Sequence, residues 1–258
     1  MTAPSAPVRR PFSDGWTLAL RLLQMYKNTP ALIAISLGAP LLMLLVFGYV
    51  FGSAIDVPDY RNYLMPGLFV TTSVNGIMGA MVGAARDRRS GITDRLGTMP
   101  ISRGAVMLGS SLADLLVNAV IFAGMAGVGL LVGWRATDGV PRAIAAFGLL
   151  LLLRFALTRA GFVLGRLCKR EDIAAQLGTL VFPVAMVSNV FVPTTGMPGW
   201  LRAIADWNPV SAATAACRTL FGSVTPGGAW PLTHPVVATL GWCAVLLVLF
   251  VPLSRRVS

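Results

Sequence analysis

Residues 104–134, GAVMLGSSLADLLVNAVIFAGMAGVGLLVGW, decide the fold class of this protein. About 20 mostly apolar residues cross the hydrocarbon core of a bilayer as a helix. This stretch is longer than that, and Asp114 is its only charged residue. Of the 258 residues in the chain 55% are hydrophobic and 12% charged, and the mean hydropathy is +0.73. Because such a composition is too apolar for one soluble globular domain, we expect a membrane protein.

Other stretches of the chain are also long and apolar enough to span a bilayer. The stretch at residues 143–165 contains Arg154 and Arg159, whereas the others contain at most one charge. The sequence therefore predicts an all-α integral membrane protein with six transmembrane helices, in a single transmembrane domain over residues 1–258. The predicted spans are residues 31–52, 62–85, 104–134, 143–165, 173–192 and 234–253.

The formal net charge of +11 comes from basic residues placed between the spans. Nucleic-acid-binding proteins instead gather basic residues on a soluble face, so we expect no nucleic-acid partner. With an even number of spans, one side collects 16 of the Lys and Arg residues and the other side 5. Since cytoplasmic loops carry the positive excess, we expect both termini in the cytoplasm and the protein in the cell (plasma) membrane.

The residue patterns of common catalytic and metal sites are missing from the sequence. Its two lysines, Lys27 and Lys169, follow Tyr26 and Cys168, so there is no G-K-[ST] phosphate loop. The single histidine, His234, cannot form a histidine cluster, and the three cysteines lack metal-site spacing. We therefore expect no enzymatic activity, metal or cofactor in this chain by itself.

Residues 12–28 have the pattern of an amphipathic helix before the first span. Trp16, Leu20 and Leu23 recur at helical spacing, and Arg21 lies off their stripe. A helix of this kind lies in the membrane interface. The alternative is an ordinary packed helix that leads into the span.

Residues 86–103, between the second and third spans, form the most charged run of the chain. They predict a short helix that starts after Ser90 and ends before Pro100. Its apolar face comprises Ile92, Leu96 and Met99, and its charged face Asp94 and Arg95. The positive-inside bias explains basic residues such as Arg88 and Arg89 but not the apolar stripe, which fits a protein partner or the headgroup layer.

Residues 193–233 are too polar to span the membrane and too apolar for a free loop. Trp200 and Ile204 share one apolar face of a short helix, and Asn208 and Pro209 end it before a second short helix. Broken helices persist at membrane depth only where protein buries them or where they line a cavity. We therefore predict an outer re-entrant segment of two half-helices, with candidate site residues Trp200, Asp206, Asn208 and Pro209.

Three stretches of the sequence resemble a known family. They are GITDRLGTMPISR at residues 91–103, LGSSLADLL at residues 108–116 and MPGWLRAIADWNPVSA at residues 197–212. Together with the predicted span count, they resemble the permeases of ABC-2 type exporters, near the daunorubicin-resistance type. The resemblance implies a six-helix subunit that pairs with a second permease, identical or different, and with two separate ABC ATPase subunits. ATP and Mg would then bind to the ATPase subunits.

The resemblance also implies where the ATPase subunits would dock. In that family the amphipathic N-terminal helix and the loop after the second span contact the ATPase, which corresponds here to residues 12–28 and 86–103. The candidate coupling residues are Trp16, Arg21, Arg88, Arg89, Ile92, Asp94, Arg95, Leu96, Met99 and Pro100.

Polar residues inside the predicted spans are the candidates for a translocation path. Asp114 and Asn118 lie one turn apart in the third span, and Arg154 lies near the middle of the fourth. At 1.5 Å per residue, Asp114 is about 18 Å from one side and Arg154 about 17 Å from the other, so the two can meet. Intramembrane charges usually pair or face a wet path, which leaves a structural ion pair and a substrate or cavity role both open. No role for Arg154 follows from the resemblance.

The function that fits these observations is the permease subunit of an ATP-driven exporter. We expect it to move a hydrophobic drug, lipid or glycolipid out of the cell by alternating access. An ion-coupled secondary transporter is one alternative, although the chain has one broken segment and no matching second one. A non-transporting membrane scaffold is the other, and it would leave Asp114, Asn118 and Arg154 without a path to line.

Overall fold

The computed structural model describes residues 30–52, 59–89, 103–168, 170–223 and 228–257. This part of the chain contains helices and no strands, which confirms the predicted all-α class. Four of its helices have the length and composition to cross a membrane, and a shorter apolar helix covers Ala34–Val50. The four are Tyr60–Arg89, Ser111–Val132, Val140–Leu167 and Pro235–Leu253. The predicted total of six spans goes beyond this and stays a prediction.

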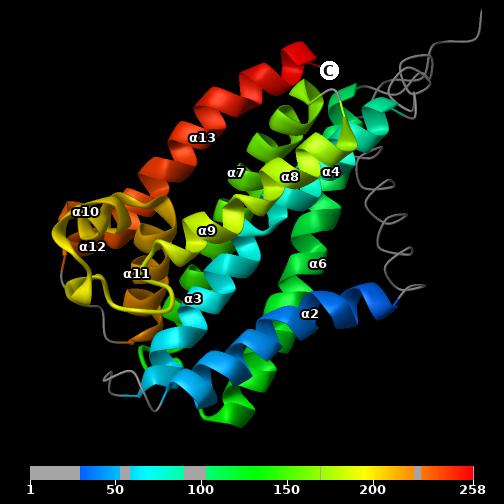
Figure 1. Ribbon diagram of the computed structural model, residues 1–258. Coiled ribbons are helices and arrows are strands. Elements are labelled where there is room, and N and C mark those ends of the chain that lie inside the picture. Colours follow the sequence, from blue (N-terminus) through cyan, green and yellow to red (C-terminus); the bar gives the residue numbers. More distant parts are fainter. Residues whose placement is uncertain (1–29, 53–58, 90–102, 169, 224–227, 258) are drawn as a thin grey trace, which may run out of the picture.

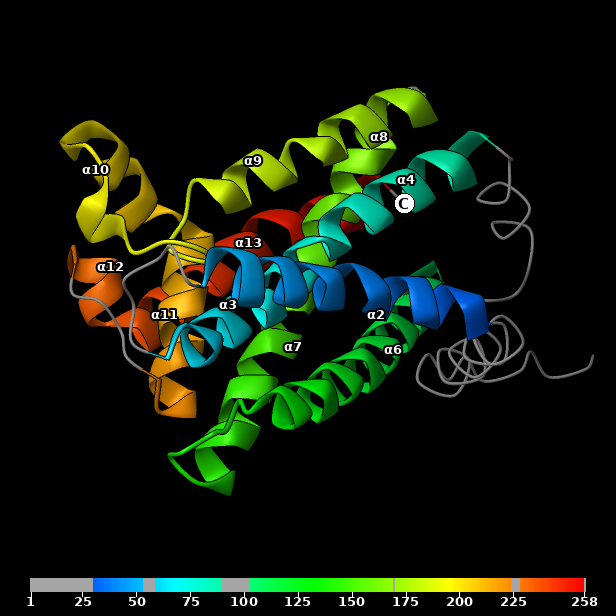
Figure 2. The same cartoon turned by 60° about the horizontal axis from the view of Figure 1, so that its bottom comes forward.

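The bundle is built around α7, which packs against α4, α13 and α11, while α2 crosses α3 and α6 on one side (Figures 1 and 2). The short helices α10 to α12 gather at one end, and the C-terminal ends of α4 and α13 lie at the other. The elements are α2 (Pro30–Leu45), which continues as the π-helix η1 (Val46–Phe51), α3 (Tyr60–Val74), α4 (Gly76–Arg89), α6 (Arg103–Val132), α7 (Val140–Leu167), α8 (Glu171–Thr179), α9 (Val181–Met186), the 3-10 turn η2 (Thr194–Gly196), α10 (Gly199–Trp207), α11 (Pro209–Phe221), α12 (Trp230–Thr233) and α13 (Pro235–Val257).

An aromatic cluster joins four helices near the α10–α12 end. The Phe69 ring of α3 packs edge-on against Phe122 of α6 and Phe147 of α7, with centroid distances of 5.9 and 5.4 Å. Phe221 of α11 and Trp134, just beyond α6, pack together at 5.2 Å. Edge-to-face pairs of this kind add to the stabilisation that burial provides, so this end of the bundle is tightly packed.

The predicted span at residues 173–192 is not one continuous helix. It is divided between α8 and α9 with Leu180 between them, and the helix ends at Met186. Pro183 lacks the amide hydrogen that would bond to the carbonyl of Thr179 four residues earlier, which explains the break. Residues 187–193 then run in turns.

The helix over Tyr60–Arg89 is also interrupted, at Asn75 between α3 and α4. The backbone amide of Asn75 donates to the carbonyl of Thr71 at 2.9 Å. The last carbonyls of a helix lack partners within the helix, so the end of α3 can accept hydrogen bonds from elsewhere.

Candidate functional site

Asp114 of α6 and Arg154 of α7 form an ion pair inside the bundle. Nη2 of Arg154 lies 2.7 Å from Oδ1 of Asp114, and Nε lies 2.8 Å from Oδ2. The Arg154 side chain is 13% exposed and the Asp114 side chain 26% exposed. This forked, charge-assisted geometry is the strong form of a carboxylate–guanidinium contact, and the contact agrees with the depths expected from the sequence.

Two further side chains hold the carboxylate in place. The hydroxyl of Thr158 donates to Oδ2 of Asp114 at 3.2 Å, and the amide of Asn118 donates to Oδ1 at 3.3 Å. The Asn118 amide also reaches the backbone carbonyl of Asp114 at 2.9 Å. Asn118, Asp114 and Arg154 therefore lie together, and their role in a translocation path stays a prediction.

Arg154 also caps the end of α3. Its Nη1 donates to the carbonyl of Thr72 at 3.0 Å, one of the carbonyls near the interruption at Asn75. A Cβ atom at Gly76 would lie 2.2 Å from Cζ of Arg154, so a glycine is needed for the guanidinium to approach this closely. One side chain thus links α3, α6 and α7 at the joint between α3 and α4.

A polar cavity of about 320 Å³ adjoins this ion pair. It follows α4 from Gly76 to Asp87, a rise of about 16 Å along the helix. At Gly79 and Gly83, which also line it, an added Cβ atom would meet no atom within 4 Å. The arrangement offers a polar path along α4 that ends at the Asp114–Arg154 pair.

Another arginine, Arg218 of α11, lies near the α10–α12 end. Its side chain is fully buried, and its Cζ lies 3.5 Å from the ring centroid of Tyr63. Nε donates to the carbonyl of Tyr63 at 3.0 Å, and Nη2 donates to the carbonyls of Asn189 and Val190 at 2.9 and 3.1 Å. Among the described residues no carboxylate forms an ion pair with it.

These bonds fix the non-helical residues that follow α9. The hydroxyls of Tyr60 and Tyr63 donate to the carbonyls of Phe191 and Asn189, both at 2.8 Å. The hydroxyl of Ser211 accepts from the amide of Asn189 at 3.0 Å. Buried backbone groups need such partners, and side chains of α3 and α11 supply them.

Asn208, selected from the sequence as a helix breaker, connects two elements. Its Oδ1 accepts from the amide of Val210 at 2.9 Å and so caps α11, whose first turn begins with Pro209. Its Nδ2 donates to the carbonyls of Val184 and Val187 at 2.8 and 2.7 Å. The same amide therefore starts α11 and closes the end of α9.

The other residues selected in this segment lie apart from the ion pair. Asp206 is buried, and its Oδ2 accepts from the amide of Ala229 at 3.2 Å and lies 3.7 Å from Nε of Arg202. The Trp200 side chain is 69% exposed, which suits a membrane-interface position. That α10 and α11 dip into the bilayer as half-helices stays a prediction.

The candidate coupling residues divide into two groups. Arg88 and Arg89 are exposed in the last turn of α4, where Nη1 of Arg88 donates to the carbonyl of Arg166. The remaining ones lie outside the described residues, so their role stays a prediction. These are Trp16, Arg21, Ile92, Asp94, Arg95, Leu96, Met99 and Pro100.

The role of Arg218 was not predicted from the sequence. The count of basic residues on the two sides of the membrane only assigns Arg218 to the outer side. Its signal is a single arginine in PVSAATAACRTLF, a helix otherwise made of small and apolar residues. A charge in such a helix needs buried partners. The tyrosines of α3, Tyr60 and Tyr63, carry no comparable signal.

Comparison with known proteins identifies the family. The model of the ABC-2 type transporter family matches residues 14–221, a range that includes Arg154 and Arg218. The chain belongs to this family. It is accordingly a permease subunit of an ABC transporter, and the ABC-2 family associates such a subunit with an ABC ATPase subunit.

Several curated permeases are similar to this ABC-2 chain over most of its length. The daunorubicin resistance ABC transporter permease protein DrrB1 of Streptomyces coeruleorubidus is 30% identical over 239 residues, covering 92% of this chain and 82% of that protein. The probable doxorubicin resistance permease DrrC of Mycobacterium tuberculosis is 25% identical over 246 residues, covering 92% and 87%. The putative transport permease ycf38 of Pyropia yezoensis is 27% identical over 242 residues, covering 89% and 79%.

Proposed function

We propose that this permease subunit exports a hydrophobic drug, lipid or glycolipid across the cell membrane by alternating access. The names of two relatives, which refer to daunorubicin and doxorubicin resistance, support a hydrophobic drug as the substrate. The proposal includes six spans with both termini in the cytoplasm, a second permease, and two ATPase subunits that bind ATP and Mg. The predicted coupling residues at 12–28 and 86–103 would contact those ATPases.

The observation that carries the proposal is the contact among Asp114, Arg154 and Thr72. It lies at the end of a polar cavity and at an interruption in a candidate span. An ion pair between packed helices is either formed or broken, so it suits an element with two discrete arrangements. We infer that it closes the path in one state and separates in the other.

The position of α4 supports the proposed coupling to ATP hydrolysis. Its basic C-terminal turn leads directly into residues 90–102, and along its length it packs against α7 and α8. A displacement imposed at Arg88 and Arg89 would therefore act on the helix that lines the polar cavity. Alternating access in this proposal starts with a movement of α4 relative to α6 and α7.

The first test is purification of the tagged protein from native membranes in mild detergent, followed by mass spectrometry of the copurifying proteins. Recovery of an ABC ATPase at a one-to-one ratio with total permease is the expected result. Transport of daunorubicin into inverted vesicles should then require ATP and should persist when an ionophore collapses the proton gradient. Transport that needs the gradient but not ATP would instead identify a secondary transporter.

A further inference from the structure

Residues 187–194, which follow α9, contain two buried polar side chains without hydrogen-bond partners. Asn189 and Thr194 are each 1% exposed. Among the residues that the structure describes, neither Oδ1 nor Nδ2 of Asn189 has a hydrogen-bond partner, and Oγ1 of Thr194 has none. A buried polar group without a partner costs free energy that an apolar side chain of the same shape does not. In this state the two side chains therefore make the protein less stable than leucine and valine would.

The backbone around these two side chains is well paired. The amide of Asn189 donates to Oγ of Ser211 at 3.0 Å, and the carbonyl of Asn189 accepts from Tyr63 and Arg218. The segment is thus held in place by its main chain. Within the same described part of the chain, the side chains of Asn189 and Thr194 add no hydrogen bond to this arrangement.

Asn208, a buried asparagine of the same region, has partners for both atoms of its amide. Its Nδ2 donates to the carbonyls of Val184 and Val187, and its Oδ1 accepts from the amide of Val210. Val187 lies two residues before Asn189 in the chain, so the two asparagines belong to one region of the fold. The lack of partners at Asn189 is therefore a property of that position and not of the region.

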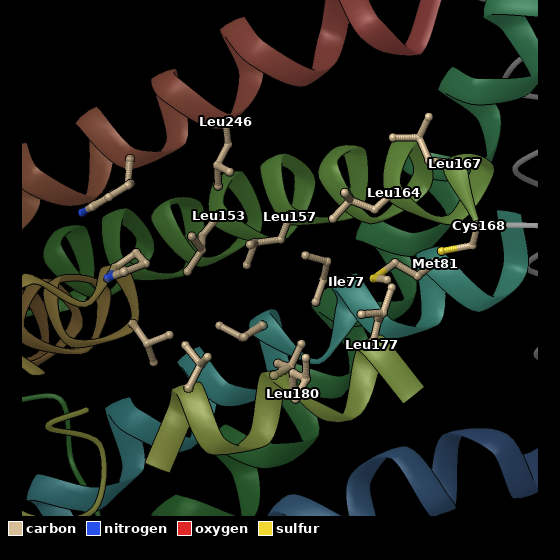
Figure 3. Close-up of a pocket in the computed structure, with 16 residues that line it drawn as sticks. Ile77, Met81, Leu153, Leu157, Leu164, Leu167, Cys168, Leu177, Leu180 and Leu246 are labelled. Atoms are coloured by element: carbon tan, nitrogen blue, oxygen red, sulfur yellow. The ribbon is translucent and has the colours of Figure 1, made fainter. Parts of the chain in front are cut away.

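Free space lies next to this segment. An apolar groove of about 560 Å³ lies among α4, α7, α8 and α13, whose side chains point into a common space (Figure 3). Its lining also includes Val184 of α9 and Val210 of α11, and Val210 precedes Ser211, which binds Asn189. Protein interiors are close packed, so a rearrangement around a buried side chain needs adjacent space. The residues around Asn189 have such space on the side of the groove.

We propose that Asn189 and Thr194 line the exit of the export path at the α10–α12 end, the predicted outer side. In the structure the exit is closed and both side chains are buried. In the alternative state of the transport cycle the exit opens, water reaches both side chains, and their polar groups gain hydrogen bonds. The free energy gained in that state favours opening. This inference rests on the alternating access proposed above, and it adds the place of the exit.

Melting temperatures of the purified permease in detergent test the closed state. Asn189→Leu replaces the unpartnered amide with an apolar side chain of similar size and should raise the melting temperature by about 3 °C or more. Asn208→Leu is the matched control and should lower it, because three hydrogen bonds are lost. Thr194→Val should raise it by a smaller amount. The hydroxyl of Thr214 donates to the Val210 carbonyl at 2.8 Å, so Thr214→Val should not raise it.

Uptake and labelling test the open state in the complete transporter. Because Asn189→Leu stabilises the closed state, it should slow ATP-dependent uptake of daunorubicin into inverted vesicles about fivefold. Asn189→Cys is made in a chain whose three native cysteines are replaced by alanine. Its reaction with a water-soluble thiol reagent should differ about tenfold in rate between the nucleotide-free and the vanadate-trapped transporter. Ala213→Cys, at an apolar position that is 1% exposed, is the control that should react slowly in both states.

Three results would overturn the inference. A lower or unchanged melting temperature for both Asn189→Leu and Thr194→Val would show that the two side chains have partners in the closed state, such as an ordered water. Uptake by Asn189→Leu at the wild-type rate, or equal labelling of Asn189→Cys in both states, would show that the exit lies elsewhere. These results leave the export proposal intact, whereas absence of ATP-dependent uptake by the wild type would refute export and this inference together.

Discussion

Arg154 and Arg218 are both arginines among apolar helices, but they are stabilised in different ways. Arg154 faces a carboxylate beside a polar cavity. Arg218 is fully buried and is held by three backbone carbonyls and the Tyr63 ring. The ion pair of Arg154 joins side chains on two separate helices, so it can break when the helices move apart. Arg218 donates hydrogen bonds to Asn189 and Val190, whose carbonyls have no helical partner after the end of α9, so its role is to stabilise this non-helical segment.

The largest effect should follow from Arg218→Leu. The change leaves the carbonyls of Tyr63, Asn189 and Val190 without this donor, and each unpaired buried group costs about 1–3 kcal/mol. We expect a loss of stability above about 4 kcal/mol and little folded protein, measured by size-exclusion chromatography and thermal melting in detergent. Arg142→Leu, at an exposed position, should melt like wild type. Normal melting of Arg218→Leu would remove the distinction between the two arginines.

Asp114→Leu should have the next largest effect, because it leaves Arg154 partly buried without its carboxylate. The expected loss of stability is about 3 kcal/mol, and daunorubicin transport should cease. The melting temperature in detergent and vesicle uptake measure the two effects. Arg170 and Asp172 form an exposed ion pair, so Asp172→Asn should change neither quantity, and transport by Asp114→Leu at the wild-type rate would contradict the proposed closing role.

Gly76→Ala tests how closely the guanidinium of Arg154 must approach α4. The added Cβ would lie 2.2 Å from Cζ of Arg154, and overpacking of this kind costs about 1–3 kcal/mol. We expect a loss near 2 kcal/mol and slower transport. Gly79→Ala, where an added Cβ meets no atom within 4 Å, is the matched control and should be at least as stable as wild type. Equal melting temperatures for the two variants would show that Arg154 is not confined by Gly76.

The smallest effect on stability should come from the double variant Asp114→Leu with Arg154→Leu. Replacing a buried ion pair with apolar side chains is often nearly neutral, and about 1 kcal/mol is expected for the unpaired Thr72 carbonyl. Transport should nevertheless be lost, because the two-state contact is gone. Thermal melting and vesicle uptake, measured on the same preparation, separate the two roles. If transport survives in this stable variant, the pair is only structural.

The features that follow simple periodicity could be predicted from the sequence. Apolar length predicted an all-helical protein, and the rise per residue placed Asp114 and Arg154 at compatible depths. Asn208 and Pro209 were selected as helix breakers, and they begin α11.

Features that depend on individual backbone groups were not predicted. The division between α8 and α9 follows from one missing amide hydrogen at Pro183 within an otherwise apolar stretch. Arg218 was missed because its partners are backbone carbonyls, which every residue has, so residue spacing does not reveal them. The hydrogen bond from Arg154 to the Thr72 carbonyl could not be predicted for the same reason, because its acceptor is a backbone group. The contact between Arg154 and Asp114 could be predicted, because the two side chains carry opposite charges.

The interruption at Asn75 has a mechanical consequence. The Tyr60 and Tyr63 hydroxyls tie α3 to the carbonyls of Phe191 and Asn189. By contrast, α4 packs against α7 and α8 and ends at Arg89. The helix Tyr60–Arg89 is therefore held by different neighbours on the two sides of Asn75, where Arg154 bonds to the Thr72 carbonyl. A movement imposed at Arg89 would reach the joint at Asn75 before it reaches α3, whose first turn is bonded to Phe191 and Asn189.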